Sequence, residues 1–338
     1  MKIRKTNKNA MISKQLLAII ILIISFAVLL MFYLIVDWNP KIDKESCHTS
    51  IVLRSTFNSA TKALEAGNAI PLKCKTEKIC FTISGEDCEA FGTPSKENQI
   101  TRIKLNSDPT KSKETIKETI ANALYDCNSM LGEGKLDFLP HKFWTQNYGL
   151  ICSRFAFDKQ AKEDLKGLGY GELYLYLQNK KIPDGRSYLE YLYPGIQDWA
   201  VSKTIFEDLK EQSQDPEFEN LEFKDWKIQF GTAENGYAII AQMKNTGTWG
   251  KYAEIAGVFT ITIGILAAIP TGGTSSALVS IGLGLLKTAV IASAKIGSGA
   301  IFIYDHPNGK YNWIPPTIYP YNKEALEGLG CSSFETAP

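Results

Sequence analysis

The sequence lacks charge over one long stretch near its beginning. Residues 16–36, LLAIIILIISFAVLLMFYLIV, contain no charged residue and no proline. A helix of this length spans about 30 Å, which matches the apolar core of a bilayer. No acid precedes Asp37, whereas five lysines and arginines lie ahead of the run. This bias predicts a cytoplasmic basic tail over residues 1–15 and a transmembrane signal anchor over residues 16–37, with the rest of the chain exported.

A cleaved signal peptide is the alternative interpretation of this run. The apolar core of a signal peptide is normally about 7–15 residues long, and a site with small residues follows it. Here the run is longer and ends in Trp38-Asn39-Pro40. We therefore expect an uncleaved anchor, which makes the lipid bilayer a partner and the cell membrane the location.

The common catalytic motifs are absent as well. The chain has neither an HExxH nor a GxSxG motif. The glycines of residues 167–171 follow a predicted helix rather than a strand, which excludes a dinucleotide-binding loop. Beyond the anchor, 32 lysines and arginines face 36 acids, a net charge of about −4 without a basic stripe. These absences favour a protein without catalysis, without a cofactor and without a nucleic-acid partner.

All the cysteines of the chain follow the apolar run. Their number is odd, so at least one lies outside any disulfide within the chain. Export would place them where disulfides persist. Metal binding is the competing interpretation, but the C-x5-C-x7-C spacing differs from that of zinc knuckles and the three histidines are isolated. We predict disulfides, with a connectivity that the spacing leaves open, although two of the cysteines flank a predicted hairpin tip at residues 75–78. The candidates are Cys47, Cys74, Cys80, Cys88, Cys127, Cys152 and Cys331.

The hydrophobic periodicity predicts an exported α+β domain over residues 38–250. Helical spacing indicates helices over residues 47–66, 113–131 and 198–212, one that Asp158 would cap, and two short ones within residues 170–193. Alternating or continuous apolar runs indicate strands over residues 71–75, 79–84, 100–105 and 148–157. Two further strands, residues 226–230 and 237–244, would form a hairpin around an Asn-Gly turn.

A second hydrophobic region, residues 251–304, precedes the C-terminal segment. Its first arm, residues 255–269, is uncharged and ends at Pro270, whereas Lys287 and Lys295 interrupt the glycine- and alanine-rich second arm. Two lysines are costly at a bilayer centre, which opposes permanent insertion of that arm. Three interpretations remain open: two membrane spans, a conditionally inserting hairpin, or a hairpin buried against the protein. We expect residues 305–338 to pack back onto the exported domain.

Two segments are candidates for function. Glu133, Lys135 and Asp137 lie in a glycine-containing loop after the helix of residues 113–131. A carboxylate pair there could bind a cation or act in acid–base chemistry, although a solvated turn is the simpler interpretation. Six tyrosines within residues 170–193 could form an aromatic platform for a sugar or peptide, against the simpler interpretation of core packing.

Four blocks of sequence carry a resemblance to a known group of proteins. They are residues 123–135 (ALYDCNSMLGEGK), 151–154 (ICSR), 237–241 (YAIIA) and 330–335 (GCSSFE). Together with the apolar N-terminal run, they resemble uncharacterised membrane-anchored exported proteins of small-genome archaea. The resemblance implies an archaeal cell-surface setting and cysteine pairing in the exported domain. It implies no activity and no functional residues.

The leading hypothesis from the sequence is a membrane-anchored cell-surface protein with a binding or assembly role. Its partner would be a membrane or surface protein of an envelope complex. One alternative is a membrane-inserting or pore-forming protein that acts through residues 255–304. Another alternative is an exported enzyme that uses Glu133 and Asp137, or a reactive cysteine.

Overall fold

The structure is a computed structural model that describes twelve parts of the chain. It divides into two compact units, Met1–Ile42 and Asp43–Pro338. Within the described residues, no helix is both long enough and apolar enough to cross a membrane. Most of the predicted anchor, the predicted helix over residues 198–212 and the whole predicted hairpin over residues 251–304 lie outside these residues. The described parts are residues 19–27, 40–60, 71–93, 99–136, 138–139, 148–193, 227–231, 235–245, 306–307, 311–329, 331 and 333–335.

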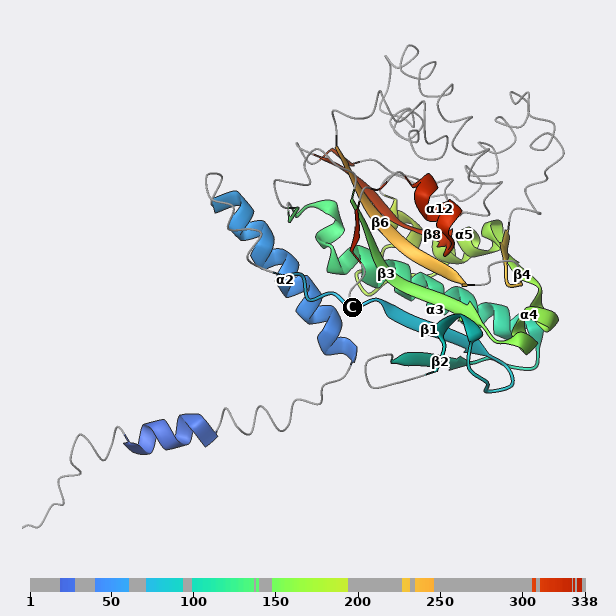
Figure 1. The fold of residues 1–338 in the computed structure, drawn as a ribbon, viewed down its shortest axis with the longest axis horizontal. Helices are drawn as coiled ribbons and strands as arrows, with labels where there is room; N and C mark the ends of the chain where they lie inside the picture. The colour runs from blue at the N-terminus through green and yellow to red at the C-terminus, as the bar shows by residue number, and fades with distance from the viewer. Residues whose placement is uncertain are drawn as a thin grey trace, which may run out of the picture. The chain divides into compact units, whose positions relative to one another are not determined.

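The second unit is built on a seven-stranded mixed sheet, as the predicted mixture of helices and strands requires (Figure 1). Five strands dominate it: β1 (Glu77–Thr82), β2 (Ile100–Lys104), β3 (Tyr148–Phe157), β6 (Tyr237–Asn245) and β8 (Tyr311–Pro320). The order is β2-β1-β3-β6-β8-β7, where β7 is His306–Pro307, and β9 (Ser333–Glu335) also pairs with β3. The strands β2, β1 and β3 are parallel, whereas β6 runs antiparallel to both β3 and β8.

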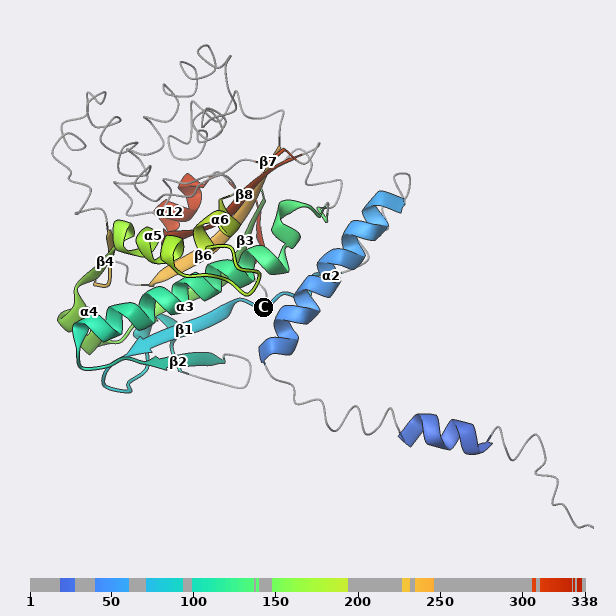
Figure 2. The ribbon, with the colours of Figure 1, turned by 180° about the vertical axis from the view of Figure 1, so that it is seen from behind.

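One face of this sheet is covered by three helices, α3 (Pro109–Met130), α5 (Tyr170–Asn179) and α6 (Tyr188–Leu192), which Figure 2 shows in front of the strands. The sequence starts α3 sharply, because Asp108 accepts a hydrogen bond from the Thr110 amide at 2.9 Å. The buried side chains of α3 recur every three or four residues and meet the main core. The helix ends at Gly132, whose φ of 66° suits glycine.

The opposite face is covered by two smaller elements. The helix α12 (Lys323–Gly328) packs over β8, where Tyr319 and Leu329 belong to one small apolar cluster. The 3₁₀-helix η2 (Glu89–Phe91) belongs to another, in which Phe91 contacts the Cys80–Cys88 pair. The C-terminal segment therefore packs on the same domain as the rest of the second unit, to the extent that it is described.

The remaining elements attach to the margins of the sheet. Helix α2 (Pro40–Ala60) buries Cys47 and Ile51 in the main core. Helix α4 (Lys159–Leu165) follows β3 directly, with Asp158 as its N-cap, as predicted. The short strands β4 (Gly167–Gly169) and β5 (Lys227–Gln229) form a separate antiparallel pair.

Three disulfides join these elements, so the prediction of disulfide bonds is confirmed. Cys47–Cys74 ties α2 to the segment before β1, and Cys80–Cys88 ties β1 to the loop that follows it. Cys127–Cys152 ties α3 to β3 at a β-bulge, where the register against β6 shifts between Ile151 and Ser153. Disulfides persist in oxidising compartments, and three of them indicate an extracytoplasmic location for this domain.

Several predicted details of the fold are wrong. β5 pairs with β4 rather than with β6, because β6 is a central strand whose two edges are taken by β3 and β8. The predicted strand over residues 71–75 is not a strand, and no hairpin tip separates Cys74 from Cys80. Residues 71–76 instead run without regular structure into β1, and these two cysteines pair with other partners.

Candidate functional site

The predicted loop does not bring two carboxylates together within the described residues. Glu133 lies in the 3₁₀-helix η3 (Gly132–Gly134), with φ 55° and ψ 31°, and Asp137 lies outside the described residues. The Glu133 carboxylate is 2.5 Å from the ammonium of Lys135, in an ion pair at the surface. The charge of Glu133 is therefore compensated locally.

The glycines of this loop are explained by packing, because side chains of other residues lie against their backbone. Gly134 has a φ of 72°, and a Cβ there would lie 2.2 Å from the ring of Trp313 on β8. The loop therefore allows a buried tryptophan to lie against the main chain. The cation-binding and acid–base hypotheses for Glu133 and Asp137 stay predictions, because Asp137 lies outside the described residues.

The histidines and cysteines are equally dispersed. Among the described residues, no group of three His, Cys, Asp or Glu side chains is placed to hold a metal ion. His48 Nδ1 lies 3.0 Å from the Met130 carbonyl at the end of α3. Cys331 is the one cysteine outside the three disulfides, half-buried with its Sγ 3.7 Å from Gln242 Oε1.

The predicted tyrosine-rich segment forms α5 and α6, but most of its phenols face inward. Tyr170, Tyr174, Tyr191 and Tyr193 are all buried. Tyr188 donates a hydrogen bond to Asn122 Oδ1 at 2.6 Å and meets the ring of Tyr125 edge-on. The segment packs α5 and α6 against α3, which agrees with the core-packing interpretation.

The carboxyl ends of β1 and β3 form the position where open parallel sheets commonly bind ligands. The chain leaves β1 toward β2 and leaves β3 toward α4, so the two connections diverge there. In this protein the Asp158 carboxylate occupies that position and is 1% exposed. It accepts hydrogen bonds from the hydroxyls of Thr82 and Ser84, at 2.7 and 2.8 Å. The position is closed by the protein's own side chains.

Arg154 is the one charged residue of β3, whose other residues are mostly apolar. That pattern marks it as a candidate functional residue. Its guanidinium stacks over the rings of Tyr321 and Phe91, at 3.8 and 5.2 Å. It also donates hydrogen bonds to the carbonyls of Asn235, at 3.2 Å, and Ala90, at 3.4 Å. Burial lowers the pKa of this guanidinium. These contacts join η2 to the start of α12. Arg154 therefore holds together the two elements that cover the second face of the sheet.

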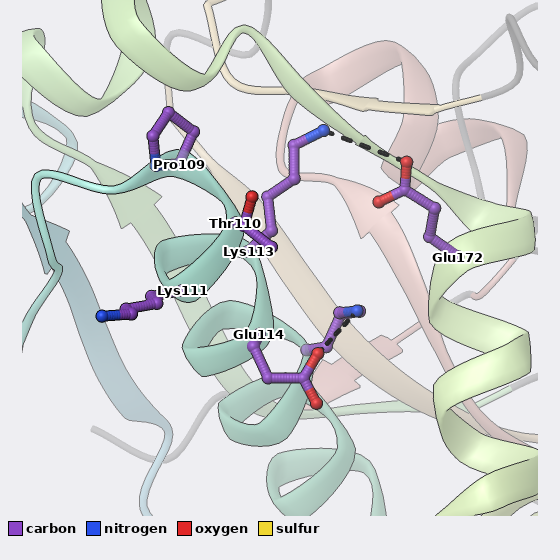
Figure 3. Close-up of a pocket in the computed structure, with 7 residues that line it drawn as sticks. Pro109, Thr110, Lys111, Lys113, Glu114 and Glu172 are labelled. Atoms are coloured by element: carbon purple, nitrogen blue, oxygen red, sulfur yellow. Dashed lines mark ion pairs between the residues drawn. The ribbon is translucent and has the colours of Figure 1, made fainter.

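An open groove of about 490 Å³ lies between the first turns of α3 and helix α5 (Figure 3). Figure 3 shows Lys113 reaching toward Glu172 of α5, whereas Lys111 points to the opposite side. The volume falls within the range of small-ligand sites. Most of its lining residues are charged, and three of them are lysines, whose aliphatic parts leave much of the surface apolar. The lining residues are Pro109, Thr110, Lys111, Lys113, Glu114, Lys117 and Glu172.

The charges of this groove are partly compensated. Lys117 and Glu114 form a close ion pair, at 2.8 Å. The Lys113–Glu172 pair and the Lys180–Glu114 pair both span 3.9 Å, close to the limit of an ion pair. Within the part of the chain that the structure describes, Lys111 has no carboxylate partner. Exposed pairs of this kind contribute about 0–1 kcal/mol each, so an incoming anion can compete for the lysines at little cost.

A tyrosine of α5, Tyr176, lies near two lysines of this region. The ammonium groups of Lys117 and Lys180 lie 5.6 and 5.5 Å from the centre of the Tyr176 ring. Burial and the nearby carboxylates of Glu118 and Glu114 raise the pKa of Tyr176 to about 12. The phenol therefore remains neutral at physiological pH, and the lysines supply the positive charge. Sequence reasoning missed this groove, because α3 and α5 meet only in the folded chain.

No protein-family model, curated protein or solved structure was found to match this chain.

Proposed function

We propose that this protein is a membrane-anchored binding protein of the cell surface, and that the groove between α3 and α5 holds an acidic ligand. The ligand would be a segment of a surface protein or polymer that bears carboxylate, phosphate or sulfate groups. The excess of lysines over glutamates in the groove, with Lys113 only loosely paired, is the observation that carries the proposal. The three disulfides support the exported location.

Two features of the groove favour an anion over a cation. Three lysines line it against two glutamates, and Lys180 stands at its margin. The Lys113–Glu172 pair spans 3.9 Å, so an incoming anion can displace Glu172 from Lys113 at little cost. The aliphatic parts of the lysine side chains also offer apolar contact to a polymer. An acidic chain therefore gains charge pairing and surface contact together.

A matched pair of charge reversals tests this proposal. The full-length protein is titrated with fluorescent poly-L-glutamate, and Lys113→Glu is compared with Lys104→Glu. Lys104 is an exposed lysine at the end of β2, paired in register with Thr82 on the sheet. We expect Lys113→Glu to weaken binding about tenfold, and the affinity of the wild-type protein to fall as salt rises.

The control separates a site from general attraction by net charge. Both substitutions change the net charge of the protein by the same amount, so only a local site distinguishes them. Equal affinities of the two variants, or no binding by the wild-type protein at low salt, would contradict the proposal.

A further inference from the structure

Strand β3 is longer than its parallel neighbour β1. Part of the edge of β3 is therefore left for another strand to pair with. β6 pairs with β3 from Tyr148 to Phe155 along one edge. On the other edge, β1 pairs only with the second half of β3, from Ser153 to Phe157. The first half of that edge lies inside the sheet, where unpaired backbone groups are costly.

The C-terminal strand β9 fills this position. It runs parallel to β3, with Ser333, Phe334 and Glu335 in register with Tyr148, Gly149 and Leu150. At the joint between β9 and β1, the hydroxyl of Thr76 donates a hydrogen bond to the Ile151 carbonyl at 2.9 Å. Three residues of the chain end therefore complete an edge that β1 leaves open.

A socket beside this edge is shaped for an aromatic ring. Phe334 lies opposite Gly149, and a Cβ on this glycine would lie 2.7 Å from two carbons of the ring. An aromatic side chain over a strand glycine is a known means of fixing register. Phe334 also packs against the apolar cluster that contains Ile151, Tyr319 and Leu329. The socket therefore selects an aromatic residue at the middle position of the inserted strand.

The segment that fills the socket is only three residues long, and among the described strands it pairs with β3 alone. Elements with few buried contacts open at a low free-energy cost. Only residues 330–332 separate β9 from Leu329, the buried C-cap of α12, and three extended residues span about 10 Å. The strand can therefore reach a neighbouring molecule while α12 stays on β8. A second copy of the chain carries the same segment and the same socket.

We propose that the edge of β3 at Tyr148–Leu150 is a strand-accepting site, and that two copies of the chain exchange their β9 strands through it. The backbone ladder supplies the attraction, and the Phe334 ring in the Gly149 socket supplies the specificity. The exchange is symmetric, because each copy donates one strand and accepts one. It provides an assembly role for a surface protein and does not depend on a ligand in the groove.

Two complementary variants test the exchange. Phe334→Ala keeps the socket but lacks the ring that fills it. Gly149→Ala keeps the ring but closes the socket. Each is made in the full-length chain with a different affinity tag, in a buffer with mild detergent, and co-purification through both tags is measured. We expect wild-type chains to pair with each other and each variant alone to lose pairing at least tenfold. A mixture of the two variants should recover pairing.

A peptide keeps the test decisive if Gly149→Ala fails to fold, which circular dichroism would show. The probe is a fluorescent peptide with the sequence of residues 331–338 that carries C331S. We expect it to bind Phe334→Ala at least tenfold more tightly than the wild-type protein, whose own strand competes for the site. The proposal is overturned if folded Phe334→Ala fails to bind the peptide, or if the mixture of two folded variants stays unpaired.

Discussion

At the scale of single residues, the buried Asp158 joins several elements of the fold through hydrogen bonds. Its carboxylate accepts hydrogen bonds from the amides of Ile83, Ser84 and Ala161, at 3.0, 3.1 and 2.7 Å, besides those from two hydroxyls. Burial alone would raise the pKa of this carboxyl group, but the hydrogen bonds to its charged form outweigh burial and lower the pKa. One side chain thus connects the ends of β1 and β3 to the start of α4.

We therefore expect Asp158→Asn to lower the free energy of unfolding by about 3 kcal/mol at neutral pH, because an amide cannot accept all five hydrogen bonds. Since the folded pKa lies below the usual aspartate value of about 3.9, the carboxylate stabilises the protein above that value. The stabilisation is lost as the pH falls through the folded pKa. Urea unfolding at several pH values measures both effects.

The exposed Asp164 on α4 provides the matched control. Asp164→Asn makes the same chemical change without a buried hydrogen-bond cluster, and we expect a change within about 0.5 kcal/mol. Equal losses for the two variants would show that Asp158 acts only through general charge.

At the scale of elements, the sequence predicts best where the local signal is strong. α3, the strand of residues 148–157 and the cap at Asp158 all agree with prediction, because each has a clear period or a capping residue. The pairing of strands was predicted less well. The Asn-Gly turn before Tyr237 suggested a local hairpin, yet β6 finds its neighbours 66 or more positions away, in register pairs such as Asn245–Tyr311 and Phe155–Tyr237. Both faces of β6 are buried, and this favours a central position in the sheet, between β3 and β8.

The candidate site shows the same limit. Glu133 stood out in the sequence because glycines surround it, but Gly132 makes room for Leu136 and Gly134 makes room for Trp313. Lys113 and Glu172 gave no signal, since 59 residues separate them in the sequence and the fold alone brings them together. The disulfides were predictable as a class, whereas their connectivity required the fold.

The three disulfides differ in how far they reach along the chain. Cys127–Cys152 closes a separation of 25 residues between α3 and β3, and Cys80–Cys88 closes only 8. A longer closed loop restricts the unfolded chain more strongly. The bond between α3 and β3 should therefore contribute more to stability than the bond within the loop after β1.

We expect the double variant Cys127→Ala/Cys152→Ala to lose about 3.5 kcal/mol of unfolding free energy, and Cys80→Ala/Cys88→Ala to lose about 2.5 kcal/mol. Denaturant unfolding of the full-length protein measures both losses. A larger loss from the shorter loop would contradict the entropic account and would indicate that packing of the Cys80–Cys88 pair against Phe91 dominates.

At the scale of the whole molecule, the two proposed surfaces lie at opposite ends of the sheet. α3 begins directly after the carboxyl end of β2, so the groove lies toward the carboxyl ends of the parallel strands. The strand-accepting site lies at the amino end of β3. A copy that is joined to another through β9 would therefore keep its groove accessible. The membrane anchor and the resemblance to archaeal surface proteins remain predictions from the sequence.

The central claim is that this domain is exported and held together by three disulfides. Cells that produce the full-length protein are denatured in urea and treated with a maleimide, either directly or after the reductant TCEP, and labelled cysteines are identified by mass spectrometry. Denaturation is needed because most of these cysteines are buried in the folded domain. We expect Cys47, Cys74, Cys80, Cys88, Cys127 and Cys152 to be labelled only after TCEP. Labelling of these six cysteines without reductant would show that they are thiols in the cell and would contradict the account.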